Sequence, residues 1–434
     1  MTVESELVGL LGFLALILLL VLRVPVGIAM IAVAMAGYAL IVSPDAALAR
    51  LGGDVFSGAA SYTLSVIPLF ILMGLLLARA ELGKDLYDLF NTALWRVRGG
   101  LGLATVAASS GFGSVSGSAV ASASTMSVVA IPEMRRYGYD DGLAAACTAV
   151  GGTLGTLIPP SAVLVLYGIL TEESIGQILI GGIVPGIMTT LLLMVTALVI
   201  VWWRPELAPA VPERLGPGVV RMLLRVWAVP VIFGLSMGGI YFGVFTPTEA
   251  GAAGASMAFV YSIATRRLGW SGVWDAASQA IRISAMIFLI IIAGQIFGFF
   301  LSATGIPQAM GSFVGDLAVA PWVVATMVFA VYFLLGALMD EIAILVIMTP
   351  ITYPVMLQLG YDPIWFGVLT VMMLLSGLLT PPVGLVTFVV GGISDIPLGK
   401  IFKAVAPFWL ALIAAVLLVI AFPDIVLFLP GLMY

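Results

Sequence analysis

The distribution of apolar and polar residues along the chain predicts helices that cross a membrane. In the first half, apolar runs extend near residues 5 to 22, 26 to 43, 62 to 80, 140 to 170 and 183 to 203. Because a bilayer crossing takes about 20 helical residues, each run is long enough for one crossing. Residues 101 to 134 differ, since the polar stretch GFGSVSGS divides them into two arms. The first arm, of about 12 residues, reaches roughly 18 Å of a core about 30 Å thick, so we expect a re-entrant helical hairpin.

The same arrangement recurs at a shift of 222 residues. Five of the seven prolines before residue 204 have a proline partner at this shift: Pro25 with Pro247, Pro132 with Pro354, Pro159 with Pro381, Pro160 with Pro382, and Pro185 with Pro407. Ordinary proline frequency would give fewer than about one such match. We therefore predict a first repeat at 1–203, a linker at 204–222 and a second repeat at 223–434. The first repeat contains a hairpin at about 101–134 and a broken helix at about 140–170, and the second has counterparts at about 321–356 and 363–392.

Five crossings per repeat is an odd number, so the second repeat must enter the membrane inverted. If the N-terminus lies outside, all of the 17 Lys and Arg residues except Arg50 fall on the cytoplasmic side. This agrees with the excess of basic residues that cytoplasmic loops carry. The acids in MTVESEL do not suit a signal peptide, so the first apolar run is interpreted as a retained span. Both termini are then expected on the periplasmic side.

Composition narrows the class of protein to an all-α integral membrane protein. Of the 434 residues, 62% are hydrophobic and 9% are charged, whereas about a quarter are charged in soluble domains. One cysteine and no histidine exclude a disulfide framework, a zinc cluster and a histidine proton relay. A net charge of −5 without a basic cluster argues against nucleic acid as a partner. No phosphate-binding loop of the G-x-x-x-x-G-K-[ST] type is present, so ATP bound to this chain is not expected.

Two double-proline segments, GGTLGTLIPPSA at 151–162 and SGLLTPPVG at 376–384, lie inside apolar runs. A Pro-Pro pair removes two backbone donors and leaves carbonyls unpaired where the bilayer offers no water. One such break is commonly an ordinary kink. Two breaks at equivalent positions of an inverted repeat, each following a hairpin with a polar tip, favour a midplane binding site of the kind found in secondary transporters.

The residue types at these places suggest what would bind. Serine oxygens in the first tip, at Ser114, Ser116 and Ser118, suit a hard cation such as Na⁺. Because no Lys or Arg lies at midplane depth, a carboxylate would depend on the N–H groups of the half-helices that follow Pro160 and Pro382.

The second tip, GALMDEIA, carries two acids. Acids deep in a bilayer indicate function, and Asp340 is favoured as a cation ligand or proton-coupling group. Glu341 is expected to cap the following half-helix. The stretch TPTE at 246–249 predicts an ordinary capping box rather than a site. Trp227, near a predicted span end, is interpreted as an interfacial anchor.

The motifs GGTLGTLIPPS, SIGQILIGGIVPGI, FTPTEAG and GLLTPPVG occur here in this order. Together they resemble the large membrane subunit, of the DctM type, of tripartite ATP-independent periplasmic (TRAP) transporters, and the resemblance extends over essentially the whole chain. It implies an elevator-type transporter in the bacterial inner membrane, coupled to inward sodium movement and without another cofactor. It also implies an organic acid as substrate, such as sialic acid or a C4-dicarboxylate. The implied partners are a small membrane subunit of about four helices and a periplasmic substrate-binding protein.

Carried over to this sequence, the resemblance implies two sodium sites and a substrate site. The first sodium site would use Ser114, Ser116, Gly117, Gly152, Gly155, Thr156 and Pro159. The second would use Gly336, Asp340, Gly377, Thr380 and Pro381. The substrate would contact Ser116, Ser118, Pro160, Ser161, Asp340, Pro382, Val383 and Gly384.

Three other functions stay open on the residues alone. A stand-alone sodium/carboxylate symporter would share the architecture and need no binding protein. A membrane-embedded enzyme would use Asp340 and Glu341 as a catalytic pair, although histidine and a D-D-x-x-D-type metal motif are absent and an enzyme needs no inverted repeat. A passive channel can also contain re-entrant hairpins.

Overall fold

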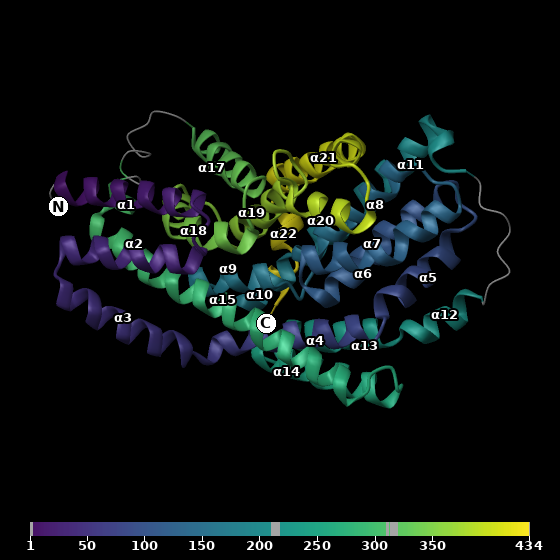
Figure 1. The fold of residues 1–434 in the computed structure, drawn as a ribbon, viewed down its shortest axis with the longest axis horizontal. Coiled ribbons are helices and arrows are strands. Elements are labelled where there is room, and N and C mark those ends of the chain that lie inside the picture. The colour runs from purple at the N-terminus through teal and green to yellow at the C-terminus, as the bar shows by residue number, and fades with distance from the viewer. Residues whose placement is uncertain (1–2, 210–217, 310–311, 313–319, 434) are drawn as a thin grey trace.

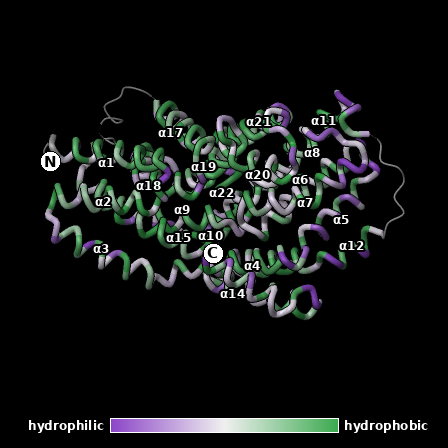
Figure 2. The backbone as a smooth tube through the Cα atoms, viewed as in Figure 1, coloured by the Kyte–Doolittle hydropathy of each residue, from purple (hydrophilic) through white to green (hydrophobic). Residues whose placement is uncertain are grey.

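The computed structural model describes residues 3–209, 218–309, 312 and 320–433, and within these ranges the regular elements are all helices. Figure 1 shows α1, α2 and α3 at one end of the long axis and α5, α11 and α12 at the other. Hydrophobic stretches run through the body of the molecule, and hydrophilic residues gather along α3 and near the ends of α5, α11 and α12 (Figure 2). This arrangement agrees with an all-α membrane protein whose polar groups lie at helix ends.

The helices of the first half are α1 (Val3–Val21), α2 (Val26–Ile41), α3 (Pro44–Ala59), η1 (Tyr62–Ser65), α4 (Val66–Arg79), α5 (Leu82–Leu94), α6 (Gly100–Ser116), α7 (Ala119–Arg136), α8 (Asp141–Thr153), η2 (Leu154–Thr156), α9 (Ala162–Thr171), α10 (Ile175–Gly181), α11 (Ile183–Trp203) and η3 (Pro205–Leu207). Those of the second half are α12 (Val219–Val226), α13 (Ala228–Tyr241), α14 (Pro247–Ala264), α15 (Trp270–Thr304), α17 (Pro321–Gly336), α18 (Glu341–Gln358), α19 (Pro363–Gly377), α20 (Leu385–Ser394), α21 (Leu398–Ala421), α22 (Asp424–Leu427) and η4 (Pro430–Leu432). The predicted linker is described only in part, because residues 210–217 lie outside the described ranges.

Helix bounds follow the 222-residue shift seen in the sequence. Helices α7 and α18 each have 18 residues and begin 222 positions apart, and so do the starts of α8 and α19. Not all counterparts agree. For example, α3 and α4 are separated at Ala60 and Ser61, whereas the matching part of the second half is one continuous helix, α15, of 35 residues. The opposite orientation of the two halves in a membrane stays a prediction.

Five helical stretches among the described residues are long and apolar enough to span a bilayer, or six if the bent pair α12 and α13 is one span. They are 62–79, 175–203, 270–304, 341–358 and 398–421. This number includes only long helices, so it leaves out shorter apolar helices and is below the ten crossings predicted from the sequence. The arm α17 and the half-helices α9, α19 and α20 are all apolar helices of 10 to 17 residues.

The helices that were not predicted as elements include α3, α5 and α12. Helix α3 begins at Pro44, and Ser43 caps it by accepting a hydrogen bond from the Ala46 N–H at 3.1 Å. Helix α5 buries Leu82, Leu86 and Leu89 on one side. All three lie between predicted spans and mix charged with apolar residues, so their hydropathy is too low to be recognised as membrane crossings.

The predicted capping box at the start of α14 is confirmed. The Glu249 N–H donates to Thr246 Oγ1 at 3.3 Å, and the Thr246 N–H donates to Glu249 Oε2 at 2.8 Å. The bond from this backbone N–H, together with one from the Thr246 hydroxyl, lowers the pKa of the exposed Glu249 carboxyl. Glu249 is therefore a structural residue at a helix start.

Candidate functional site

The first hairpin consists of α6 and α7, and its tip is only two residues long. Gly117 adopts a left-handed conformation with φ of 63° and donates its N–H to Gly113 O at 2.9 Å, which ends α6. Ser118 then caps α7 by accepting from the Ala121 N–H at 3.4 Å. Two helices of 17 and 18 residues thus approach each other at the predicted tip.

This tip lies directly against the first helix break. A Cβ built on Gly117 would be 2.8 Å from Pro160 O, and one built on Gly155 would be 2.9 Å from Ser118 O. Gly113 and Gly155 are equally close, since a Cβ on Gly113 would be 2.7 Å from the Gly155 Cα. The structure therefore brings the tip at Gly113 to Ser118 against the break at Gly155 to Pro160, the two segments between which the first sodium site was predicted.

Side-chain hydroxyls satisfy part of the broken backbone between α8 and α9. Thr156 Oγ1 donates to Thr153 O at 2.9 Å, and the Ser161 hydroxyl donates to Thr156 O. Ser161 also caps α9, because its Oγ accepts from the Leu164 N–H at 3.2 Å. Every residue from Gly151 to Ser161 is buried. A carbonyl oxygen has two lone pairs, so these bonds leave capacity for a cation.

The hydroxyls of the tip serines are oriented within their own hairpin. Ser114 is buried and its hydroxyl donates to Gly111 O at 2.7 Å. Ser116 and Ser118 are half-buried, and the Ser116 hydroxyl makes a long contact of 3.5 Å with Ser118 O. Because a donating hydroxyl still has lone pairs, all three serines can offer oxygens to a cation.

The second hairpin, α17 and α18, contacts the second break in a similar manner. A Cβ on Gly377 would lie 2.6 Å from Phe333 O and 2.7 Å from two backbone atoms of Gly336. Thr380, the other predicted ligand in this break, donates its hydroxyl to Ser376 O at 2.9 Å. Gly377 is 222 residues after Gly155, so both breaks place a glycine against the backbone of a hairpin.

The acids of the second tip differ from the sequence prediction. The cap of α18 is Asp340, which accepts from the Ile342 N–H at 3.1 Å and is exposed. Glu341, which was predicted to cap, is instead buried in the first turn of α18. Its Oε2 has no hydrogen-bond partner among the described residues. The cap assignment fails because either neighbouring acid suits an N-terminus, and only the helix start decides between them.

Two predicted anion donors are already used in this arrangement. Val383 and Gly384 donate their N–H groups to Ala337 O at 3.2 and 3.4 Å. Both groups, which were predicted to face a carboxylate, therefore share the Ala337 carbonyl as their acceptor in this structure. The segment is otherwise accessible, with Pro381, Pro382 and Val383 exposed.

Elements of the two halves interlock around the breaks. Helix α20 packs against α7 and α8, and α9 packs against α18 and α19. Two hydrogen bonds join the far ends of the hairpins to α20 and to the turn after α9. Arg135 donates to Ser394 O at 3.0 Å, and Tyr353 donates to Glu173 Oε1 at 2.5 Å. Each hairpin is thus fixed to the half-helix of the other half.

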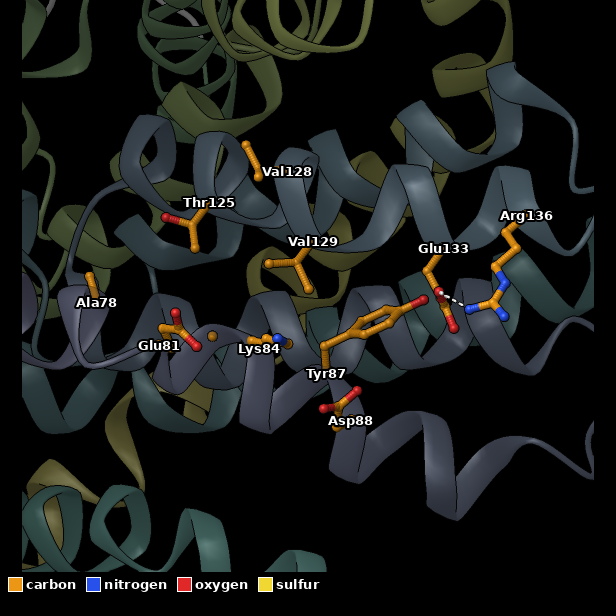
Figure 3. Close-up of a pocket in the computed structure, with 11 residues that line it drawn as sticks. Ala78, Glu81, Lys84, Tyr87, Asp88, Thr125, Val128, Val129, Glu133 and Arg136 are labelled. Atoms are coloured by element: carbon orange, nitrogen blue, oxygen red, sulfur yellow. Dashed lines mark ion pairs between the residues drawn. The ribbon is translucent and has the colours of Figure 1, made fainter. Parts of the chain in front are cut away.

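A cavity of about 630 Å³ lies beside the first hairpin, between α5 and α7 (Figure 3). Glu81, Lys84 and Tyr87 line one wall, and Thr125 and Glu133 line the other. None of the predicted ligand residues lines it. The sequence analysis missed this cavity, although the spacing of Leu82, Leu86 and Leu89 signals an amphipathic helix there. No group of three or more His, Cys, Asp or Glu side chains able to hold a metal occurs among the described residues.

Comparison with known proteins matches the chain almost completely. Residues 13–425 match the family described as "Tripartite ATP-independent periplasmic transporter, DctM component". The chain is 35% identical over 401 residues to the C4-dicarboxylate TRAP transporter large permease protein DctM of Pseudomonas aeruginosa, covering 90% of this chain and 91% of that protein. It is 30% identical over 416 residues to the sialic acid TRAP transporter large permease protein SiaM of Vibrio cholerae, covering 95% and 96%.

A solved structure shares the fold at low sequence identity. The YdaH transporter of Alcanivorax borkumensis superposes with a TM-score of 0.60 at 13% identity, covering 88% of this chain and 86% of that one. At this identity the likeness concerns the fold alone. The relatives are permease subunits rather than enzymes, and the family matches from α1 to α22. The chain therefore belongs to the DctM family, the large permease component of tripartite ATP-independent periplasmic transporters.

Proposed function

We propose that this subunit moves an organic acid together with Na⁺ across the bacterial inner membrane, into the cytoplasm. The observation that carries the proposal is the backbone contact at both breaks. Gly155 and Gly377 occupy equivalent positions, and each lies so close to a hairpin that a Cβ would be within 3 Å of a carbonyl oxygen. Such contacts gather backbone oxygens without any side-chain charge, which suits a hard monovalent cation.

The proposed first sodium site lies between the tip at Ser114 to Gly117 and the break at Gly152 to Pro159. The second lies between Gly336 or Asp340 and the break at Gly377 to Pro381. Both combine loop carbonyls with hydroxyls, namely Thr156 and Thr380, as in other transporters with discontinuous helices. Glu341 follows Asp340 as a buried acid in the first turn of α18, and a buried acid at this depth indicates a functional position.

The substrate would lie between the two tips. Ser116, Ser118 and Ser161 supply hydroxyls on the first side, and the N-terminus of α9 supplies the positive end of a helix dipole. On the second side, the N–H groups of Val383 and Gly384 would become available when the Ala337 carbonyl moves away from them. Opening of the second hairpin would thereby expose donors for a carboxylate. The named relatives carry C4-dicarboxylates and sialic acid, and both are carboxylates.

We further infer an elevator mechanism in which the hairpins and broken helices move as one body. The interlocking of α7 and α8 with α20, and of α9 with α18 and α19, supports movement as a unit. The partners would be a small membrane subunit of about four helices and a periplasmic substrate-binding protein. Both termini would then lie in the periplasm, as the charge distribution predicts.

The test is uptake into proteoliposomes that contain this subunit with its cognate small subunit. A panel of labelled organic acids is offered with and without the binding protein, under an inward Na⁺ gradient or an equal K⁺ gradient. We expect saturable uptake that requires both Na⁺ and the binding protein. Equal uptake without the binding protein would favour a stand-alone symporter, and unsaturable flux that ignores Na⁺ would favour a channel.

A further inference from the structure

A second polar cavity, of about 440 Å³, lies where the α4–α5 junction meets α12 and the turn between α14 and α15. Its lining includes four basic side chains, Arg79, Lys84, Arg225 and Arg267, which we call the basic pocket. Three carboxyl groups also line it, those of Glu81, Asp85 and Asp88. Four basic and three acidic groups thus line the pocket, and Asp275, outside the lining, forms an ion pair with Arg79.

Two of the four cations are held in place by the protein itself. Arg267 Nη1 donates to Ala80 O at 3.0 Å and forms an ion pair with Asp85. Arg79 forms an ion pair with Asp275 at 3.5 Å and donates to Gln279 Oε1 at 3.1 Å. These contacts join α4, α5 and α15, so this side of the pocket is fixed whether or not a ligand is present.

The other two cations are exposed. Lys84 projects from α5 and Arg225 from α12, and neither forms an ion pair with another described residue. They come from helices that pack against each other. An anion between them would therefore meet two charges whose partners the described protein does not supply.

Helix α12 places an apolar surface beside this pocket. Its Met222 and Val226 are buried, whereas Val220, Leu223 and Leu224 are 73%, 52% and 70% exposed. The helix meets α13 at 50°, so it turns away from that apolar helix. Arginines and exposed leucines on one short helix are typical of a helix that lies in the membrane interface. Trp227 at the junction, 49% exposed, suits the same depth.

We propose that the basic pocket binds the headgroup of an anionic glycerophospholipid, such as phosphatidylglycerol, whose acyl chains lie along the exposed leucines of α12. The negative charge of a phosphodiester can pair with Lys84 and Arg225, and the guanidinium group of Arg225 suits phosphate oxygens. The hydroxyls of a glycerol headgroup can donate to Glu81 or Asp88. Basic pockets between helices on the cytoplasmic side bind such headgroups in other membrane proteins. The inference rests on the proposed function in one respect, the placement of this end at the cytoplasmic face.

The experiment uses the full-length protein purified in a neutral detergent, and it requires no transport. Thermal unfolding is followed by tryptophan fluorescence while phosphatidylglycerol or phosphatidylcholine is added at matched mole fractions. Native mass spectrometry counts the lipids that remain bound. We expect phosphatidylglycerol to raise the unfolding temperature and to be retained in preference to phosphatidylcholine. The double variant K84A/R225A should bind it about 25-fold more weakly, because each cation near a headgroup contributes about a kilocalorie per mole.

The matched control is R282A/K403A, which removes the same two charges from exposed positions outside the pocket. It should keep the wild-type response, and both double variants should unfold at the wild-type temperature without lipid. Equal stabilisation by phosphatidylcholine, or equal loss in both double variants, would overturn the proposal. Inorganic phosphate at the same concentration should have no effect. If it reproduces the lipid effect, the pocket is a site for a soluble anion and the lipid assignment is wrong. Because unfolding temperature and bound lipid are measured without transport, this test still decides on the lipid site if sodium-driven uptake is not found.

Discussion

Replacing Gly377 with alanine is expected to weaken sodium binding at the second break while leaving the protein folded. A Cβ at this position would lie 2.6 Å from Phe333 O, whereas ordinary van der Waals contact begins at 3.4 Å. The first arm of the hairpin must therefore retract by about 0.8 Å, the difference between these two distances. The atoms that would be struck belong to the backbone of α17, so no side-chain rotation can relieve the contact.

The expected magnitudes follow from this displacement. Overpacking a close contact typically costs 1–3 kcal/mol, and alanine in place of helical glycine returns roughly 0.5–1 kcal/mol. The free energy of unfolding should thus fall by at most about 2.5 kcal/mol. A hard cation binds its oxygens at about 2.4 Å, so a shift of about 0.8 Å removes those oxygens from coordination. We expect the apparent sodium affinity to fall at least tenfold, or about 1.4 kcal/mol.

The assay measures the rise in unfolding temperature of the purified subunit as NaCl replaces KCl at constant ionic strength. Sodium dependence of uptake is then titrated in proteoliposomes with the partner proteins. The control is Gly392→Ala in α20, where no atom lies within 4 Å of the added Cβ. It should keep the wild-type sodium response and gain a few tenths of a kilocalorie per mole or more in stability. If Gly377→Ala titrates with sodium like Gly392→Ala, the close contact has no part in cation binding and the reasoning fails.

Three further outcomes test other parts of the site and the topology. Thr380→Val keeps the shape of the side chain but removes the hydroxyl, so sodium-dependent uptake should fall at least tenfold. The control Thr326→Val, on the exposed face of α17, should leave uptake unchanged. Equal uptake in the two variants would remove Thr380 from the site. Asp340→Asn removes the charge but keeps an oxygen that can cap α18, so the unfolding temperature should change little. The sodium titration should shift to higher concentration. A wild-type titration would exclude Asp340 as a ligand. Because the single native cysteine, Cys147, is buried, an impermeant maleimide should label Glu172→Cys from outside and Arg214→Cys only from inside, and the reverse pattern would overturn the predicted orientation.

The sequence predicted the pairing of tips and breaks because prolines and glycines restrict where a helix can continue. Pro159 and Pro160 end one helical segment whatever surrounds them, and Gly117 permits the left-handed turn that a two-residue tip requires. The two prolines recur 222 residues later as Pro381 and Pro382, and this recurrence located the second break. These features depend on local backbone chemistry, which a sequence states directly.

The sequence was less informative where two neighbouring residues suit the same role. Asp340 and Glu341 both fit a helix start, and a one-residue difference in where α18 begins decides which is exposed and which is buried. The N–H groups of Val383 and Gly384 were predicted to face a carboxylate, and here they donate to Ala337 O, an acceptor that is set by how far the hairpin closes. That distance depends on tertiary packing, which the local pattern does not contain.

Segments of the two halves that correspond at the 222-residue shift differ in helix continuity. Helix α15 extends without interruption over 35 residues, or about 52 Å, whereas its counterpart is divided at Ala60 and Ser61 into α3 and α4. An uninterrupted helix of this length keeps both of its ends in fixed relation, while a divided one lets its two parts tilt independently. Any bending that accompanies the transport cycle would therefore occur mainly between α3 and α4. A partner that bound across this interruption would slow the cycle far more than one that bound to α15.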